Sequence, residues 1–155
     1  MQVAPFPLLD EHTADVAAAP DDVWPALLET LDRAFSGPVV GGYARIVGCA
    51  DTTASGPRPL AEGARLPGFR VAVAEPGRAL VLEGSHRFSA YALSFRLEAL
   101  GAGSTRLRAE SRATFPGLAG QGYRLLVVGT GAHVLAVRRL LLAVRRRSEP
   151  RPARS

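Results

Sequence analysis

Two long stretches of alternating polarity, joined by the turn sequence Gly101 to Ser104, constrain the fold of this chain most strongly. Before the turn, one face would carry Tyr91, Leu93, Phe95 and Leu97. After the turn, one face would carry Thr105, Leu107, Ala109, Ser111, Ala113 and Phe115, and the other would carry charged residues. Alternation with a period of two is typical of a half-buried β-strand. The sequence therefore predicts an antiparallel hairpin with one apolar face.

Four further segments are predicted to be strands. The first covers residues 8–18 and would place His12, Ala14 and Val16 on one face. Two more lie within residues 68–85 and are separated by Glu75-Pro76-Gly77, a proline-glycine turn that favours a second hairpin. The glycine-rich and proline-rich segment 36–67 predicts one strand near residues 43–48, and the rest of it stays unassigned.

Two segments have helical periodicity. The first starts near Pro20 with two acids in its opening turn, and Pro25 is expected to lie in that same turn, where proline is tolerated. The second covers residues 118–147 and is predicted to be one long helix with an apolar stripe formed by Leu126, Thr130, His133, Val137, Leu140 and Val144. Gly129 and Gly131 would each cost such a helix about 1 kcal/mol, so we expect a close approach of its backbone to a sheet or ligand.

The order of these elements predicts an α+β fold, and 155 residues suit one domain. Three segments resemble the START-like superfamily, which includes polyketide cyclases/dehydrases and lipid-transport proteins and is also called SRPBCC: residues 16–28, 68–84 and 123–141. The resemblance implies a helix-grip fold, in which a curved antiparallel sheet is wrapped around a long C-terminal helix. It also implies a cavity between them for an apolar or aromatic molecule. We expect a single domain at 1–147 and a disordered basic tail at 148–155.

Charge is concentrated at one end of the chain. Residues 138–155 contain seven arginines and one acid, whereas the other 137 residues contain twelve arginines and thirteen acids. The body is therefore nearly neutral, and we expect no nucleic-acid partner. All basic residues are arginine, which favours a GC-rich, bacterial genome rather than a phosphate-binding role. The single cysteine, together with the lack of a signal-peptide or membrane-spanning pattern, predicts a cytoplasmic protein.

Six polar residues fall on positions predicted to face the interior: His12, His86, Tyr91, Ser111, Thr130 and His133. Buried polar groups need partners. They either pair with one another, with backbone or with water, or they contact a ligand or transfer a proton in a cavity. Arg87, in a turn, is a weaker candidate for the cavity rim, and Arg112 is expected on a solvated strand face.

Other chemistries lack their sequence signals. The histidines and the cysteine have no metal-ligand spacing, and no phosphate loop is present, so we expect neither metal nor cofactor. Three functions stay open. The first is binding of a small hydrophobic or aromatic, lipid-like or polyketide-like molecule. The second is a cyclase, aromatase or dehydratase that uses His86, His133 or Tyr91. The third is an interaction protein whose basic C-terminal helix end contacts an anionic membrane or an acidic partner.

Overall fold

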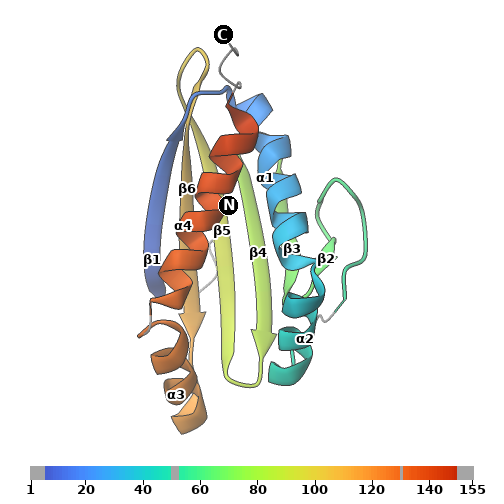
Figure 1. Cartoon of the computed structure of the whole chain (residues 1–155), viewed down its shortest axis with the longest axis vertical. Helices are drawn as coiled ribbons and strands as arrows, with labels where there is room; N and C mark the ends of the chain where they lie inside the picture. The colour runs from blue at the N-terminus through green and yellow to red at the C-terminus, as the bar shows by residue number, and fades with distance from the viewer. Residues whose placement is uncertain (1–5, 50–52, 130, 150–155) are drawn as a thin grey trace.

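The computed structural model describes residues 6–49, 53–129 and 131–149, and these form a six-stranded antiparallel sheet with helices on one face (Figure 1). The strand order is β1-β6-β5-β4-β3-β2. The elements are β1 (Leu8–Val16), α1 (Pro20–Phe35), α2 (Pro38–Val47), β2 (Arg65–Leu66), β3 (Phe69–Glu75), β4 (Ala79–His86), β5 (Ser89–Gly101), β6 (Ser104–Thr114), α3 (Gly117–Val127) and α4 (Ala132–Ser148).

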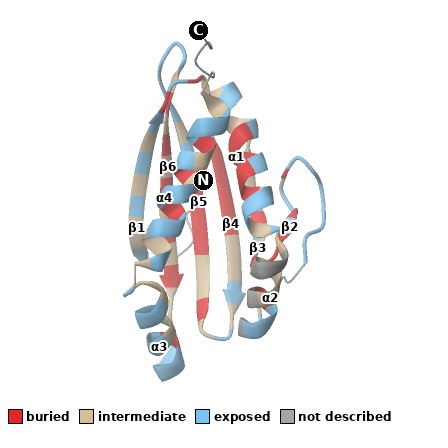
Figure 2. Ribbon diagram, in the orientation of Figure 1, coloured by how far each residue is buried: buried red, intermediate tan, exposed pale blue. Residues whose placement is uncertain are grey.

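The strand predicted at the N-terminus and the two predicted hairpins are confirmed as β1, β3–β4 and β5–β6. Residues alternate between buried and half-buried along the whole of β6, and Leu97 of β5 lies opposite Leu107 of β6. The apolar face of the sheet packs against the helices, as the buried residues in Figure 2 show. The core between the layers includes Leu107 and Phe95 from the sheet and Val137, Leu141 and Val144 from α4.

Helix α1 forms where the sequence predicted it, but Pro25 does not lie in its first turn. The helix begins at Pro20, so Pro25 is an interior residue and leaves the carbonyl of Asp21 without its usual helical hydrogen bond. Burial offsets this loss, because Val23, Leu27 and Leu31 are fully buried against the sheet and α4.

The strand predicted near residues 43–48 is wrong, because this segment belongs to helix α2. Proline stands in the first turn of the helix, and Gly48 ends it in the left-handed conformation with a φ of 73°. The amide of Cys49 then donates to the carbonyl of Ala44 at 2.9 Å, which closes the last turn. A short apolar run suits a strand or a helix equally well, and here the two ends of the segment favour the helix.

The single long C-terminal helix is also wrong, because the chain forms α3 and α4, bent by 54°. Gly131 has a φ of 76°, and a Cβ on Gly129 would lie 2.5 Å from the carbonyl oxygen of Leu125. The two glycines therefore mark a break in the helix and not a close approach to the sheet. The apolar stripe accordingly holds in α4, whereas Leu126 in α3 is 66% exposed.

The length and hydropathy of the described helices bear on whether they could cross a membrane. None of them alone is long and apolar enough to cross a membrane, although α3 and α4 taken together reach that length and composition. Val137, Leu141 and Val144 of α4 are buried in the domain core. Core packing therefore accounts for a good part of the apolar character of this pair.

Candidate ligand cavity

A cavity of about 240 Å³ lies at the end of the sheet where α2, α3 and the β4–β5 turn meet, at the bottom of Figure 1. Its wall combines the ends of β3, β4, β5 and β6 with α2, α3 and the first turn of α4. The break between α3 and α4 gives the cavity part of its wall, because Val127, Val128 and His133 all line it. The lining is predominantly apolar and aromatic, as is common for small-molecule sites.

Aromatic rings form a connected series along this wall. Phe35 at the end of α1 contacts Phe69 with ring centres 4.9 Å apart, and Phe69 contacts Tyr91 at 5.2 Å. The series continues through His86, whose ring centre is 5.6 Å from Tyr91 and 4.7 Å from Tyr123. Tilted and edge-to-face contacts at these distances are favourable for aromatic pairs. Strand periodicity predicted that His86 and Tyr91 face inward. It did not predict Tyr123, which reaches this wall only because α3 is a separate helix.

Tyr91 is held firmly in the cavity wall. Its hydroxyl donates to the carbonyl of Gly68 at 2.5 Å and lies 3.8 Å from the sulfur of Cys49. Gly84 is its cross-strand partner, and a Cβ there would lie 2.6 Å from the tyrosine ring and 2.1 Å from the Gly68 oxygen. The lack of a side chain at Gly84 therefore allows the ring to cross β4 and reach β3.

His86 ends β4 with its ring among the aromatic side chains. The amide of Phe88 donates to its Nδ1 at 3.1 Å, so this nitrogen is an acceptor and the ring proton is on Nε2. Burial lowers the pKa of His86 below its ordinary value, because the charged form loses solvation. The structure thus keeps His86 neutral and accounts for its inward position by ring packing and a backbone hydrogen bond.

A second polar group surrounds Asp10, a residue that the sequence reasoning missed. Nε2 of His12 is 3.4 Å from one Asp10 oxygen, and Nε2 of His133 is 3.4 Å from the other. Ser111, directly opposite Asp10 across the β1–β6 pair, is 4% exposed and lines the cavity. Asp10 has the same strand parity as His12, which is the signal that would have placed it inside.

The predicted site residues do not all reach the cavity. His86, Tyr91, Ser111 and His133 line it, whereas His12 is not part of the wall and contacts Asp10 beside it. Thr130 lies outside the described residues.

The two arginine candidates also end in different places. Arg87, the predicted rim residue, lies against Gly48, where a Cβ would be 2.8 Å from its Nε. The solvated position expected for Arg112 is wrong. This side chain is 26% exposed, its Nε is buried and it donates to the carbonyl of Phe6 at 3.3 Å. The hydrogen bond to Phe6 thus ties Arg112 to the residues directly before β1.

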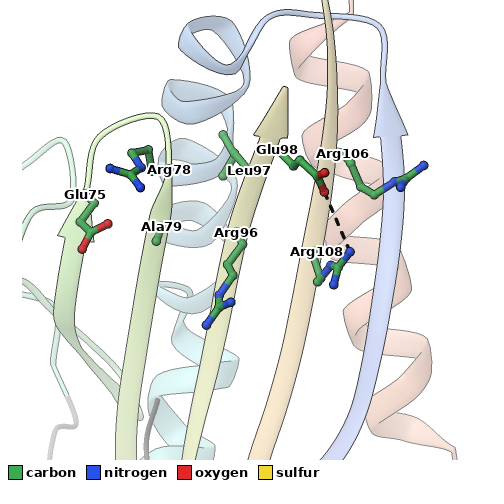
Figure 3. A pocket seen from close by; sticks show the side chains of 8 residues that line it. All are labelled: Glu75, Arg78, Ala79, Arg96, Leu97, Glu98, Arg106 and Arg108. Atoms are coloured by element: carbon green, nitrogen blue, oxygen red, sulfur yellow. Dashed lines mark ion pairs between the residues drawn. The ribbon is translucent and has the colours of Figure 1, made fainter. Parts of the chain in front are cut away.

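A larger hollow of about 590 Å³ lies on the sheet face that carries no helix (Figure 3). It is lined mostly by charged side chains of the segment from β3 to β6, and two of its four arginines pair with acids. Arg106 pairs with Asp15 at 3.0 Å, and Arg108 pairs with Glu11 at 3.3 Å and with Glu98 at 4.0 Å. A solvated, ion-paired strand face explains this hollow without a ligand.

A metal site needs several ligating side chains close together. No group of three or more histidine, cysteine, aspartate or glutamate side chains in the described chain is placed to hold a metal ion. The trio of Asp10, His12 and His133 is instead arranged with both imidazoles directed at the one carboxylate. The aromatic-lined cavity is therefore the candidate site.

Comparison with known proteins gives matches in structure only. No protein-family model matches the sequence, and no curated protein matches it. CalU16 from Micromonospora echinospora is 20% identical with a TM-score of 0.53, over 92% of this chain and 76% of CalU16. Zhui aromatase/cyclase from Streptomyces sp. R1128 is 19% identical with a TM-score of 0.55, over 90% of this chain and 92% of Zhui.

A third solved structure shares this architecture. The Aha1 dimer from Colwellia psychrerythraea is 16% identical with a TM-score of 0.50, over 90% of this chain and 94% of Aha1. Similarity at this level of identity concerns the fold, and function has to be argued from the site. With its curved sheet and its C-terminal helices, and with these structural relatives, the chain has the helix-grip fold.

Proposed function

We propose that the protein binds a small apolar or aromatic molecule, lipid-like or polyketide-like, in the cavity between the sheet and the C-terminal helices. The observation that carries this proposal is the connected series of aromatic rings around a hollow of about 240 Å³. An apolar wall with a few oriented polar groups is what small-molecule sites commonly provide. The likeness to Zhui, an aromatase/cyclase, favours an aromatic ligand over an aliphatic one.

The neutral state of His86 supports the same ligand class. Its proton on Nε2 is a single hydrogen-bond donor in an aromatic wall, and its Nδ1 is already occupied by the Phe88 amide. The Tyr91 hydroxyl is likewise engaged with backbone. Most of the polar atoms in this part of the wall therefore have partners, and an apolar ring can occupy the space between them without leaving them unpaired.

Binding of the neutral fluorescent probe N-phenyl-1-naphthylamine tests the proposal. Ala113 is buried, lines the cavity and lies opposite Tyr91, so Ala113→Phe should fill the space and weaken probe binding at least tenfold. Ala102→Phe, in the exposed β5–β6 turn, is the matched control and should bind the probe like the original chain. Circular dichroism establishes that both variants are folded. Equal probe affinity in a folded Ala113→Phe protein would contradict the proposal.

A proton-transferring enzyme of the cyclase, aromatase or dehydratase type is the second candidate. It is favoured by the presence of two histidines in one cavity, with His133 directed at a carboxylate and His86 kept neutral. General acid–base catalysis needs such groups close to a bound substrate. The two candidates are distinguished by recovering the bound molecule from protein purified from its own host. The recovered molecule is then incubated with the protein and analysed by mass spectrometry before and after. An unchanged mass supports ligand binding, and a product that has lost water supports the enzyme.

A further inference from the structure

The buried polar atoms that lack hydrogen-bond partners are concentrated beside one end of the cavity. In residues 6–49, 53–129 and 131–149, five buried side-chain atoms have no partner, and these are Asp10 Oδ1, His12 Nε2, Ser111 Oγ, Arg112 Nε and His133 Nε2. Buried polar atoms in folded proteins are nearly always satisfied, so such a group needs an explanation. Ser111 and His133 line the cavity itself, which makes a ligand the natural partner.

Local irregularity in β1 builds this group. Leu8 lies opposite Arg112 while Asp10 lies opposite Ser111, so Leu9 is an extra residue in the strand. A β-bulge of this kind redirects side chains, and here Leu9 lines the cavity while Asp10 faces the helices from the buried side of the strand. The first turn of α4 then brings His133 over the carboxylate from the other layer.

The Asp10 carboxylate determines how the His133 ring is oriented. Nε2 of His133 lies 3.4 Å from an Asp10 oxygen, within ion-pair distance but without a hydrogen bond between the two atoms, so the carboxylate faces the Nε2 edge of the ring. His12 approaches the second oxygen in the same way and holds the carboxylate from behind. This end of the cavity wall thus combines the Ser111 hydroxyl, which can donate or accept, with the His133 ring and the Arg112 guanidinium.

We propose that Ser111 and His133 bind a hydroxyl group of the ligand, with Asp10 as the positioning residue for the His133 ring. This inference rests on the proposed function. A hydroxyl donates and accepts at once, so it can satisfy both groups, whereas a carbonyl only accepts and a hydrocarbon does neither. A carboxylate or phosphate would lie close to Asp10 and is disfavoured, because Arg112, the cation in this wall, already contacts Glu110 at 3.6 Å and the carbonyl of Phe6. The ligand class is therefore a phenol or alcohol attached to an apolar, preferably aromatic, body.

Competition against N-phenyl-1-naphthylamine with matched small molecules measures this preference. We expect 2-naphthol to bind at least tenfold more tightly than naphthalene, and 2-naphthoate to bind no more tightly than naphthalene. Ser111→Ala should abolish the advantage of 2-naphthol and leave the affinity for naphthalene unchanged. A Ser111→Ala protein in which both affinities fall together would show a structural role and overturn the proposal.

Asp10→Asn tests the positioning role, because it removes the carboxylate charge that faces the His133 ring. The variant should lose most of the preference for 2-naphthol, whereas Glu11→Gln, on the opposite face of β1 and paired with Arg108, should keep it. The nitrogen chemical shifts of the His133 ring, measured by NMR in the original chain, give an independent readout. Addition of 2-naphthol should change the Nδ1 shift, and addition of naphthalene should leave it in place.

The outcomes separate this inference from the proposed function. If naphthalene and 2-naphthol bind equally well to the original chain, the hydroxyl site is wrong while the cavity still binds apolar molecules. The same conclusion follows if 2-naphthol leaves the His133 ring nitrogens unchanged. If neither these molecules nor N-phenyl-1-naphthylamine bind, the proposed function itself fails and the hydroxyl site falls with it.

Discussion

The position of Tyr91 depends on a residue with no side chain. Gly84→Ala would put a Cβ 2.1 Å from the Gly68 oxygen and 2.6 Å from the Tyr91 ring, so the β3–β4–β5 backbone would have to move. We expect the free energy of unfolding to fall by about 1–3 kcal/mol, as for other overpacked sites, together with weaker binding of N-phenyl-1-naphthylamine.

A matched glycine replacement controls for the loss of backbone freedom. Gly42 lies in α2 with no heavy atom within 4 Å of its would-be Cβ, so Gly42→Ala should stabilise the protein by about 0.5–1 kcal/mol. Urea unfolding followed by the fluorescence of the single tryptophan, Trp24, measures both changes. If Gly84→Ala were as stable as Gly42→Ala, the close contact at Tyr91 would not restrict the wall of the cavity.

His86 should make the stability of the protein depend on pH. Burial lowers its pKa in the folded state below the ordinary value of 6.5, so the unfolded chain binds the proton more readily. Its contribution to stability is therefore complete above about pH 6.5 and is lost as the pH falls through that value toward the lower pKa of the folded state. The urea midpoint of the original chain should fall relative to that of His86→Phe as the pH is lowered from 8 to 5. A constant difference over this range would show that His86 is not protonated more readily on unfolding.

Strand parity predicted which side of the sheet each polar side chain faces, and the positions of His86, Tyr91 and Ser111 in the cavity wall follow from it. It did not predict Asp10 as a central group, because a carboxylate on a buried face makes sense only beside its two imidazole partners. Those partners are two and 123 residues away in sequence, and the second comes from another layer. Pairings between layers depend on tertiary packing and not on periodicity.

The elements show the same division between local and non-local information. The β3–β4 and β5–β6 hairpins are predictable because alternation and turn residues specify them locally. Helix α2 is not predictable in this way, because a short apolar segment suits a strand or a helix, and the residues at its two ends decide which one forms. The break between α3 and α4 was visible in the sequence as Gly129 and Gly131, but a continuous helical period concealed their effect. This break shapes the cavity, so the site depends on the least predictable part of the chain.

At the scale of the whole molecule, the order of strands and helices was sufficient to predict one curved sheet against C-terminal helices, because few architectures accommodate it. The cavity volume and the identity of its polar end were not predictable, since both depend on where three elements end relative to one another. Charge is also distributed unevenly along the chain. From Ser111 to Ser148 the chain contains no acid, and the exposed arginines of α4 include Arg138, Arg145 and Arg146.

Deletion of residues 149–155 tests whether the basic end contributes to folding or to an interaction. Arg147 is anchored before the deletion point, because its guanidinium donates to the Thr30 hydroxyl at 2.9 Å. The Arg145–Glu149 pair, at 2.7 Å, lies at the surface, where ion pairs contribute little to stability. The urea midpoint should therefore stay nearly unchanged, and a large loss of cooperativity would mean that the tail packs on the body.

The same truncated protein decides whether the arginines bind membranes. The full chain and the truncated chain are compared for sedimentation with vesicles rich in phosphatidylserine, with uncharged phosphatidylcholine vesicles as the control. If ligand binding in the cavity is the function, neither protein should sediment with anionic vesicles at physiological ionic strength, because a few exposed arginines at a helix end interact favourably with the helix dipole and are screened by salt. Sedimentation of the full chain that is lost on truncation, or on replacing Arg145 and Arg146 with glutamate, would instead support a role at anionic membrane surfaces.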